Sequence, residues 1–274
     1  MGFMATRRTS EFLRLAEIPR AGFEIASLMA AAPWMTLSPR GDRHPVIVIP
    51  GFLADDDSTR ILRAYLDHLG YEENPWGHGR NMGAARMGGY ESLVSHVLRV
   101  HREADQKVSL VGWSLGGVHS LAVAERAAYA VRQVITLGSP IVQEGPTTSL
   151  FAALRTAAAA INGVPINTPT PSALGWRDIF ERISPRIPVT SIYSRTDGVV
   201  PWQRSHIEPA ERRDNIEVHS SHIGLGFNPA VLYAIADRLA QPEDTFEPFH
   251  RHGWRALTYP KPDAPKSDRH STTT

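Results

Sequence analysis

The sequence predicts an α/β fold with a mostly parallel central sheet and helices on both faces. The continuous apolar run 45–50 is typical of a strand that is buried on both faces of a parallel sheet. Strand-like runs then alternate with helix-like segments along most of the chain. A further apolar run, 108–111, ends in Gly-x-Ser-x-Gly and is followed at once by an alanine-rich helical stretch.

The predicted elements follow one another in a regular order after an N-terminal helical segment. Strands are expected at 45–50, 71–76, 108–111, 133–137, 189–194 and 215–219. Helices are expected to end near 69 and to cover 91–102, 118–130 and 229–239. The order is interrupted between 139 and 187, where we expect a helix at 150–161, a Pro/Thr-rich stretch and a helix at 176–183.

Ser114 is the candidate nucleophile. It stands at the centre of the Gly-x-Ser-x-Gly segment, between a predicted strand and a predicted helix. The sharp turn that such a position requires leaves room only for small residues two positions away, and Gly112 and Gly116 meet that demand. A serine hydroxyl is a weak nucleophile until a base removes its proton, so the chain must also supply a histidine and an orienting carboxylate.

Asp197 and His222 are the candidate acid and base. Asp197 lies in a turn that ends the predicted strand 189–194, and His222 lies beyond the predicted strand 215–219, beside a glycine. The alternative base, His219, falls within that predicted strand. The alternative acid, Asp214, precedes it and would lie at the opposite edge of the sheet.

Backbone N–H groups are the expected donors for the negative charge that acyl transfer builds on the substrate's carbonyl oxygen. One should belong to Leu115, directly after the nucleophile. Phe52, in the turn after strand 45–50, is the expected second donor, with Leu53 as the alternative. Gly51 is expected to permit the unusual backbone of this turn.

Four segments carry a resemblance to a known family. They are Ile49–Phe52, Gly112–Gly117, Ser194–Pro201 and Ser221–Leu225. With them the chain resembles the α/β-hydrolase superfamily, and within it the bacterial lipase- and esterase-like serine hydrolases, over about residues 44–240. The resemblance implies an α/β-hydrolase fold and carboxylic-ester chemistry. It identifies no substrate.

We expect a single domain over residues 1–260 and a disordered tail over 261–274, where Lys, Pro, Ser and Thr dominate. The N-terminal segment at about 8–36 is interpreted as a pair of amphipathic helices. Their expected packing residues are Phe12, Leu15, Phe23, Leu28 and Met29. An export signal is the alternative interpretation of this segment, although charged residues interrupt it.

The insertion at about 140–187 is expected to form a helical cap over the active site and to help bind the substrate. Apolar residues there and beside the catalytic segments are candidates for contact with an acyl or aromatic group. They are Trp113, Leu53, Trp202, Leu150, Leu154 and Trp176. For any one of them, packing onto the core is the alternative.

The composition agrees with a globular enzyme. The formal net charge of +1 gives no reason to expect a nucleic-acid partner. The chain has no cysteine, which excludes disulfides and favours the cytoplasm over export. No apolar run approaches the length of a transmembrane helix. The oligomeric state stays open.

These residues together predict a serine esterase that works through a Ser-His-Asp triad and an acyl-enzyme, without a cofactor or a metal. An acyltransferase, or a thioesterase or amidase, could use the same triad. A non-catalytic binding protein of the same fold is the alternative from another functional class.

Overall fold

The structure is a computed structural model, and it describes residues 13–142, 145–163, 180 and 182–261. Six parallel strands form one sheet in the order β2-β1-β3-β4-β5-β6. The strands are β1 (Pro45–Ile49), β2 (Glu72–Pro75), β3 (Val108–Trp113), β4 (Val131–Leu137), β5 (Val189–Tyr193) and β6 (Arg213–Glu217). The helices are α2 (Glu17–Met35), α3 (Arg60–Leu69), α4 (Tyr90–Ala104), α5 (Leu115–Arg126), α6 (Ser149–Asn162), α8 (Pro229–Leu239) and α9 (Arg255–Thr258). The predicted α/β class with a parallel sheet is confirmed.

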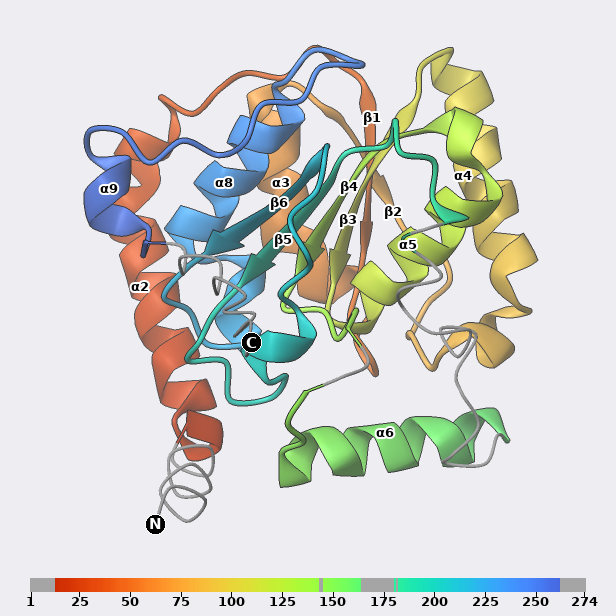
Figure 1. Ribbon diagram of the computed structural model, residues 1–274, viewed down its shortest axis with the longest axis horizontal. Coiled ribbons are helices and arrows are strands. Elements are labelled where there is room, and N and C mark those ends of the chain that lie inside the picture. The colour runs from red at the N-terminus through yellow and green to blue at the C-terminus, as the bar shows by residue number, and fades with distance from the viewer. Residues whose placement is uncertain (1–12, 143–144, 164–179, 181, 262–274) are drawn as a thin grey trace, which may run out of the picture.

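Helices cover both faces of the sheet, α4 and α5 on one side and α2, α3 and α8 on the other (Figure 1). Strand β1 shows how the sequence produces this arrangement. Its side chains alternate between the two cores, with Ile47 and Ile49 in one and Val46 and Val48 in the other. Because both cores are apolar, the strand has the continuous apolar sequence that predicted it.

Several element boundaries differ from the sequence-based expectation, and two of these elements adjoin the candidate site. The helix predicted at 118–130 begins at Leu115 and ends at Arg126, and a short 3-10 turn follows at Ala128–Ala130. The strand predicted at 215–219 is β6, which begins at Arg213 and ends at Glu217. His219 therefore lies beyond the strand, and the argument that placed it inside was wrong.

The N-terminal helix packs differently from the prediction. Glu17–Met35 is one continuous helix, and Phe12 lies outside the described residues. Leu15, Phe23 and Met29 were expected to pack, but they are 73%, 74% and 76% exposed. The buried side of the helix includes two acidic residues, described below, and Leu28 contacts the core only in part. Hydrophobic periodicity failed here because hydrogen bonds to backbone groups hold the buried carboxylates.

Helix α6 is the described part of the predicted cap. It lies across the end of the molecule toward which the strand arrows point (Figure 1). Thr148 caps it by accepting a hydrogen bond from the backbone N–H of Phe151. Most of the second predicted cap helix, 176–183, and of the predicted tail, 261–274, lies outside the described residues. Within the described part of the chain, no helix is both long and apolar enough to span a membrane.

Candidate active site

Ser114 occupies a strained turn between β3 and α5. Its backbone has φ 53° and ψ −117°, and residues other than glycine rarely adopt a positive φ of this kind. The glycines on either side are required by space. A Cβ on Gly112 would overlap the backbone of Gly117, and a Cβ on Gly116 would overlap the carbonyl of Ile49. The demand for small neighbours that the sequence predicted is therefore confirmed.

Asp197 and His222 are hydrogen-bonded to each other, as a triad requires. Nδ1 of His222 lies 2.6 Å from Oδ2 of Asp197, and both residues are buried. The other carboxylate oxygen, Oδ1, accepts the backbone N–H groups of Val199 and Val200 at 2.8 and 2.7 Å. The carboxylate is thus fixed on both sides and can hold one orientation of the imidazole ring.

The environment of His222 favours its protonated form. Burial by itself lowers the pKa of His222, but the charge and the hydrogen bond of Asp197, together with the charge of Glu17, raise it above the usual imidazole value. An imidazole whose positive charge is stabilised in this way can accept a proton from a nucleophile during a reaction.

The chain segments that carry Ser114, Asp197 and His222 meet at the carboxyl ends of the strands. Nε1 of Trp113, directly before Ser114, donates a hydrogen bond to the carbonyl oxygen of His222 at 3.1 Å. A Cβ on Gly138, directly after β4, would lie 3.0 Å from Oδ2 of Asp197 and 3.2 Å from Nδ1 of His222. The Ser114 hydroxyl has no hydrogen bond to a described residue. Its contact with His222 therefore stays a prediction.

The alternative acid and base lie in other surroundings. Asp214 is part of β6, where its carboxylate accepts the backbone N–H groups of Asn215 and Phe249. Burial raises the pKa of Asp214. His219 is exposed, and its carbonyl oxygen accepts a hydrogen bond from Asn228. Neither side chain has a recorded contact with Ser114, Asp197 or His222 among the described residues.

The turn after β1 lies against the nucleophile. A Cβ on Gly51 would be 3.3 Å from Cβ of Ser114, so this glycine serves close approach. The left-handed residue of the turn is Leu53, with φ 64°, and the conformational role predicted for Gly51 was wrong. The N–H of Leu53 donates to the carbonyl of Asn81 at 2.8 Å and is therefore occupied. For the N–H groups of Phe52 and Leu115, no acceptor is recorded among the described residues.

Asn81 fixes this turn, and no motif in the sequence indicates that role. Its side-chain amide donates to the carbonyl of Pro50 at 2.8 Å, and its backbone N–H donates to the carbonyl of Ala54 at 2.7 Å. Nε2 of His119 lies 3.2 Å from Oδ1 of Asn81. Burial lowers the pKa of His119 to about 4, so the ring is neutral near pH 7. Asn81 lies in a glycine-rich loop that matches no catalytic motif, so the sequence alone does not single it out.

The predicted substrate-contacting residues have varied surroundings. Leu150 and Leu154 of α6 pack against a cluster of Phe151, Val199 and Val200, directly beyond Asp197. The side of α6 that carries these leucines therefore attaches this helix to the loop that holds Asp197.

Two of the predicted aromatic contacts are already engaged within the protein. The Trp202 ring stacks on Tyr193 at 5.8 Å and lies under the guanidinium of Arg195 at 4.2 Å. The Trp113 ring is tied to the His222 loop by its indole N–H. Leu53 is 45% exposed beside the candidate site, and Trp176 lies outside the described residues.

A second chain of Asp, His and Ser side chains lies at the opposite edge of the sheet. Nδ1 of His44 contacts Asp42, and Nε2 of His44 is 2.8 Å from Oγ of Ser109. This serine is completely buried, whereas the Asp42 side chain is 51% exposed. An active site needs the reverse, an accessible serine and a sheltered acid. Arg132 also pairs with Asp42 at 2.8 Å, which indicates a structural ion pair.

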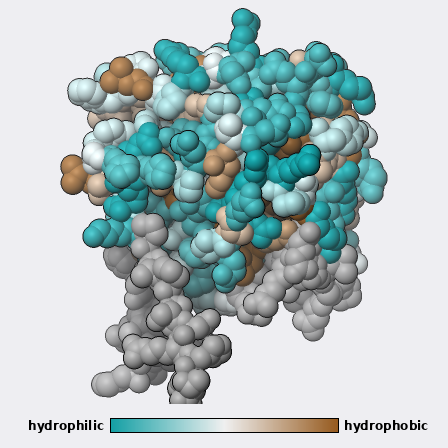
Figure 2. All heavy atoms as spheres, turned by 45° about the horizontal axis from the view of Figure 1, so that its top comes forward, coloured by the Kyte–Doolittle hydropathy of each residue, from teal (hydrophilic) through white to brown (hydrophobic). Residues whose placement is uncertain are grey.

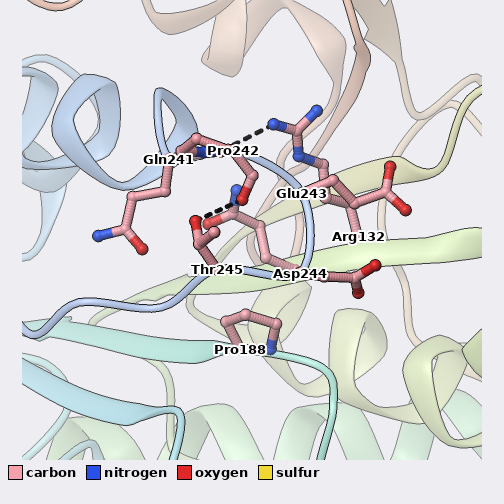
Figure 3. A pocket seen from close by; sticks show the side chains of 8 residues that line it. Arg132, Pro188, Gln241, Pro242, Glu243, Asp244 and Thr245 are labelled. Carbon is pink, nitrogen blue, oxygen red and sulfur yellow. Dashed lines mark hydrogen bonds between the residues drawn. The ribbon is translucent and has the colours of Figure 1, made fainter.

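The hollow that the described residues form beside Arg132 is too small for a substrate. The hollow beside Arg132 (Figure 3) has a volume of about 10 Å³, enough for about one water molecule. Pro188 and the segment Gln241–Thr245 line it, and Arg132 donates a hydrogen bond to the carbonyl of Gln241 at 2.7 Å. The surface seen when the top of Figure 1 is turned forward is mostly hydrophilic, with apolar residues in small separate groups (Figure 2). The carboxyl ends of the strands remain the candidate site.

Sequence comparisons give no relative. No protein family matches this chain in a comparison with family models, and no curated protein matches it in a sequence search.

Comparison of structures does give a result. An esterase from Exiguobacterium antarcticum is similar over 72% of this chain and 93% of its own, with a TM-score of 0.51 and 16% identity. A pyrethroid hydrolase from Sphingobium faniae covers 73% and 98%, with a TM-score of 0.51 and 19% identity. Lipase B from Aspergillus fumigatus covers 73% and 53%, with a TM-score of 0.53 and 16% identity. At this identity the likeness concerns the fold: the chain has the α/β-hydrolase fold.

Proposed function

We propose that the protein is a serine hydrolase that cleaves carboxylic esters, with Ser114 as nucleophile, His222 as base and Asp197 as the orienting acid. The observation that carries the proposal is the 2.6 Å contact of His222 with Asp197, at the sheet edge where the strained turn presents Ser114. Ligands of open α/β sheets bind outside the carboxyl ends of the strands, which is where these residues lie. The esterase, lipase and pyrethroid hydrolase that share the fold support the same class of chemistry.

The proposed reaction has two halves. In the first, Nε2 of His222 takes the hydroxyl proton of Ser114 while Oγ attacks the ester carbonyl carbon. The bond to the alcohol then breaks, and His222 passes its proton to the departing alkoxide. In the second half, His222 deprotonates a water molecule that attacks the acyl-enzyme, and the acid is released as the Ser114 hydroxyl re-forms.

The negative charge on the substrate's carbonyl oxygen needs fixed donors during both halves. We assign this role to the backbone N–H groups of Phe52 and Leu115. The competing donor, Leu53, already bonds to Asn81, and the N–H of Leu115 lies at the positive end of helix α5. Two such donors would stabilise the tetrahedral intermediate without any metal or organic cofactor.

The proposed substrate is a small-molecule ester with an apolar acyl or aromatic group. Leu53, in the turn after β1, and the exposed parts of Leu150 and Leu154 on α6 are the proposed contacts. Trp113, Trp202 and Trp176 remain proposed contacts. For the first two, any contact with substrate would use the part of the ring that the interactions described above leave free.

The experiment is hydrolysis of p-nitrophenyl esters of increasing chain length by the natural protein and by Ser114→Ala. We expect the variant to fold and to lose about 10⁴-fold or more in kcat/KM, as loss of a nucleophile does in other serine hydrolases. A fluorophosphonate probe should label the natural protein at Ser114 and leave the variant unlabelled. Hydrolysis that survives in the variant, or a natural protein that neither cleaves esters nor takes the label, would contradict the proposal.

A further inference from the structure

The N-terminal helix α2 (Figure 1) packs against helix α8 and against the short turn Ile223–Gly226 that directly follows His222. Its two acidic residues, Glu17 and Glu24, are 4% and 6% exposed. Buried carboxylates are costly unless donors surround them, and both of these are surrounded. The donors belong to the loops that carry Asp197 and His222.

Glu17 connects the two catalytic loops. Oε1 accepts the backbone N–H of Gly198 at 2.8 Å, and Oε2 accepts the backbone N–H of Ile223 at 3.1 Å. Gly198 directly follows Asp197, and Ile223 directly follows His222. One carboxylate thus joins the residue after the proposed acid to the residue after the proposed base.

Glu24 holds the other side of the base. Oε1 accepts the backbone N–H of Ser221 at 2.9 Å and the side-chain amide of Asn228 at 3.0 Å, and Oε2 contacts the Ser221 hydroxyl. Ser221 directly precedes His222. The residues on both sides of the imidazole are therefore attached to α2 by charge-assisted hydrogen bonds, which are about twice as strong as neutral ones.

Arg20 completes the attachment. Nη1 donates to the carbonyl of Thr196 at 2.6 Å, and Nη2 donates to the Thr196 hydroxyl at 2.8 Å. Thr196 directly precedes Asp197, so the acid is also held on both sides.

The glycines of the two loops fit this arrangement. A Cβ on Gly198 would lie 2.7 Å from the backbone of Leu13, just before α2, and a Cβ on Gly224 would overlap the Glu24 carboxylate. Neither glycine has a positive φ. These two positions are therefore glycine because the N-terminal segment approaches them closely.

We propose that α2 is a positioning element of the active site, in which Glu17 and Glu24 fix the orientation of Asp197 and His222 and Glu17 adds a second negative charge facing His222. This inference rests on the proposed function. Among the described residues, the charged side chains that act on His222 are Asp197 from the loop after β5 and Glu17 from α2. Arg20 lies 3.9 Å from Glu17 on the same helix. Glu24 contacts the neighbours of His222 in the chain.

The test compares three substitutions in the full chain: Glu17→Gln, Glu24→Gln and the matched control Glu211→Gln. Glutamine keeps the size of the side chain but offers one acceptor oxygen and no charge. Glu211 is exposed and lies just before the amino end of β6, away from the carboxyl ends of the strands, so its variant reports the effect of the substitution itself. Thermal unfolding establishes that each variant is folded.

We expect Glu17→Gln and Glu24→Gln to lower kcat/KM for a p-nitrophenyl ester by about 10- to 100-fold, since small displacements of catalytic groups have effects of this size. The dependence of kcat/KM on pH distinguishes the Glu17→Gln variant from the Glu24→Gln variant. Catalysis needs neutral His222, so kcat/KM falls as the pH drops below the pKa of His222. Loss of the Glu17 charge lowers that pKa, and the acidic limb in Glu17→Gln should move to lower pH. Glu24→Gln should move it less, and Glu211→Gln should match the natural protein.

A folded Glu17→Gln protein with unchanged kcat/KM, or with an acidic limb that stays in place, would overturn the inference. Its failure can be told apart from failure of the proposed function by NMR titration of His222 in Ser114→Ala, with and without Glu17→Gln. That measurement needs no activity. A lower pKa of His222 in the double variant supports the contact with α2 even if no ester is cleaved, whereas an equal pKa refutes it.

Discussion

At the scale of single residues, the candidate site consists largely of groups that hold the proposed catalytic residues in place. Ser114 is held in a strained backbone that the native fold must enforce. Asp197 is fixed by two backbone N–H groups before it contacts His222. Leu53, with φ 64°, shapes the turn that presents Phe52, and Asn81 holds that turn from behind. Each group to which we assign a catalytic role thus depends on a neighbour that has no such role in the proposal.

Substitution of Asn81 measures how strongly activity depends on the support of the turn after β1. In Asn81→Ala, the carbonyl of Pro50 loses its donor, and the turn that presents the N–H of Phe52 loses part of its support. We expect kcat to fall by about 10- to 100-fold, somewhat less than for removal of an oxyanion donor itself. Steady-state kinetics with a p-nitrophenyl ester is the measurement, and Asn74→Ala, on the edge strand β2, is the control. An Asn81→Ala protein that is folded and fully active would show that the turn needs no such support.

At the scale of elements, sequence reasoning succeeded where the signal is local. The strand, turn and helix around Ser114 occupy consecutive residues, and the sizes of Gly112 and Gly116 are dictated within that window. The loops of Asp197 and His222 were found because each follows a strand. For α2, the decisive contacts join Glu17 to residues 181 and 206 positions away. No local pattern contains them, and the apolar residues of the helix suggested the wrong buried face.

The approach of α2 to the catalytic loops can be tested by Gly198→Ala. The φ of this residue suits alanine, so the expected damage comes from contact with the backbone of Leu13, which cannot yield as a side-chain tip can. Overpacking of this kind costs about 1–3 kcal/mol, and each kcal/mol lowers Tm by about 2–4 °C in a domain of this size. Differential scanning calorimetry measures the shift.

Gly22→Ala is the matched control for that experiment. Gly22 lies within α2, and a Cβ there would meet no atom within 4 Å. Alanine favours a helix by about 0.5–1 kcal/mol over glycine, so this variant should be more stable than the natural protein. If Gly198→Ala were equally stabilising, the N-terminal segment would not lie against the Asp197 loop.

At the scale of the whole molecule, the polarity of the parallel sheet separates the proposed active site from a buried chain of polar side chains. The carboxyl ends of all six strands point to one edge, which carries Ser114, Asp197, His222 and helix α6. The amino ends carry the buried chain of Ser109, His44 and Asp42. Both edges contain the three residue types of a triad, so residue type alone does not define the site. Accessibility of the serine and the surrounding backbone decide between them.

Ser109→Ala tests this division of the molecule. Removing the Ser109 hydroxyl leaves Nε2 of the buried His44 without its partner, which costs about 1–3 kcal/mol of stability. The carboxyl edge is untouched, so kcat/KM should stay within about twofold of the natural value and the fluorophosphonate label should remain on Ser114. Calorimetry and kinetics on the same preparation measure both effects, with Ser114→Ala showing the opposite pattern of normal stability and lost activity. If Ser109→Ala instead lost activity while keeping its Tm, the amino edge would take part in catalysis, and the placement of the active site by sheet polarity would be wrong.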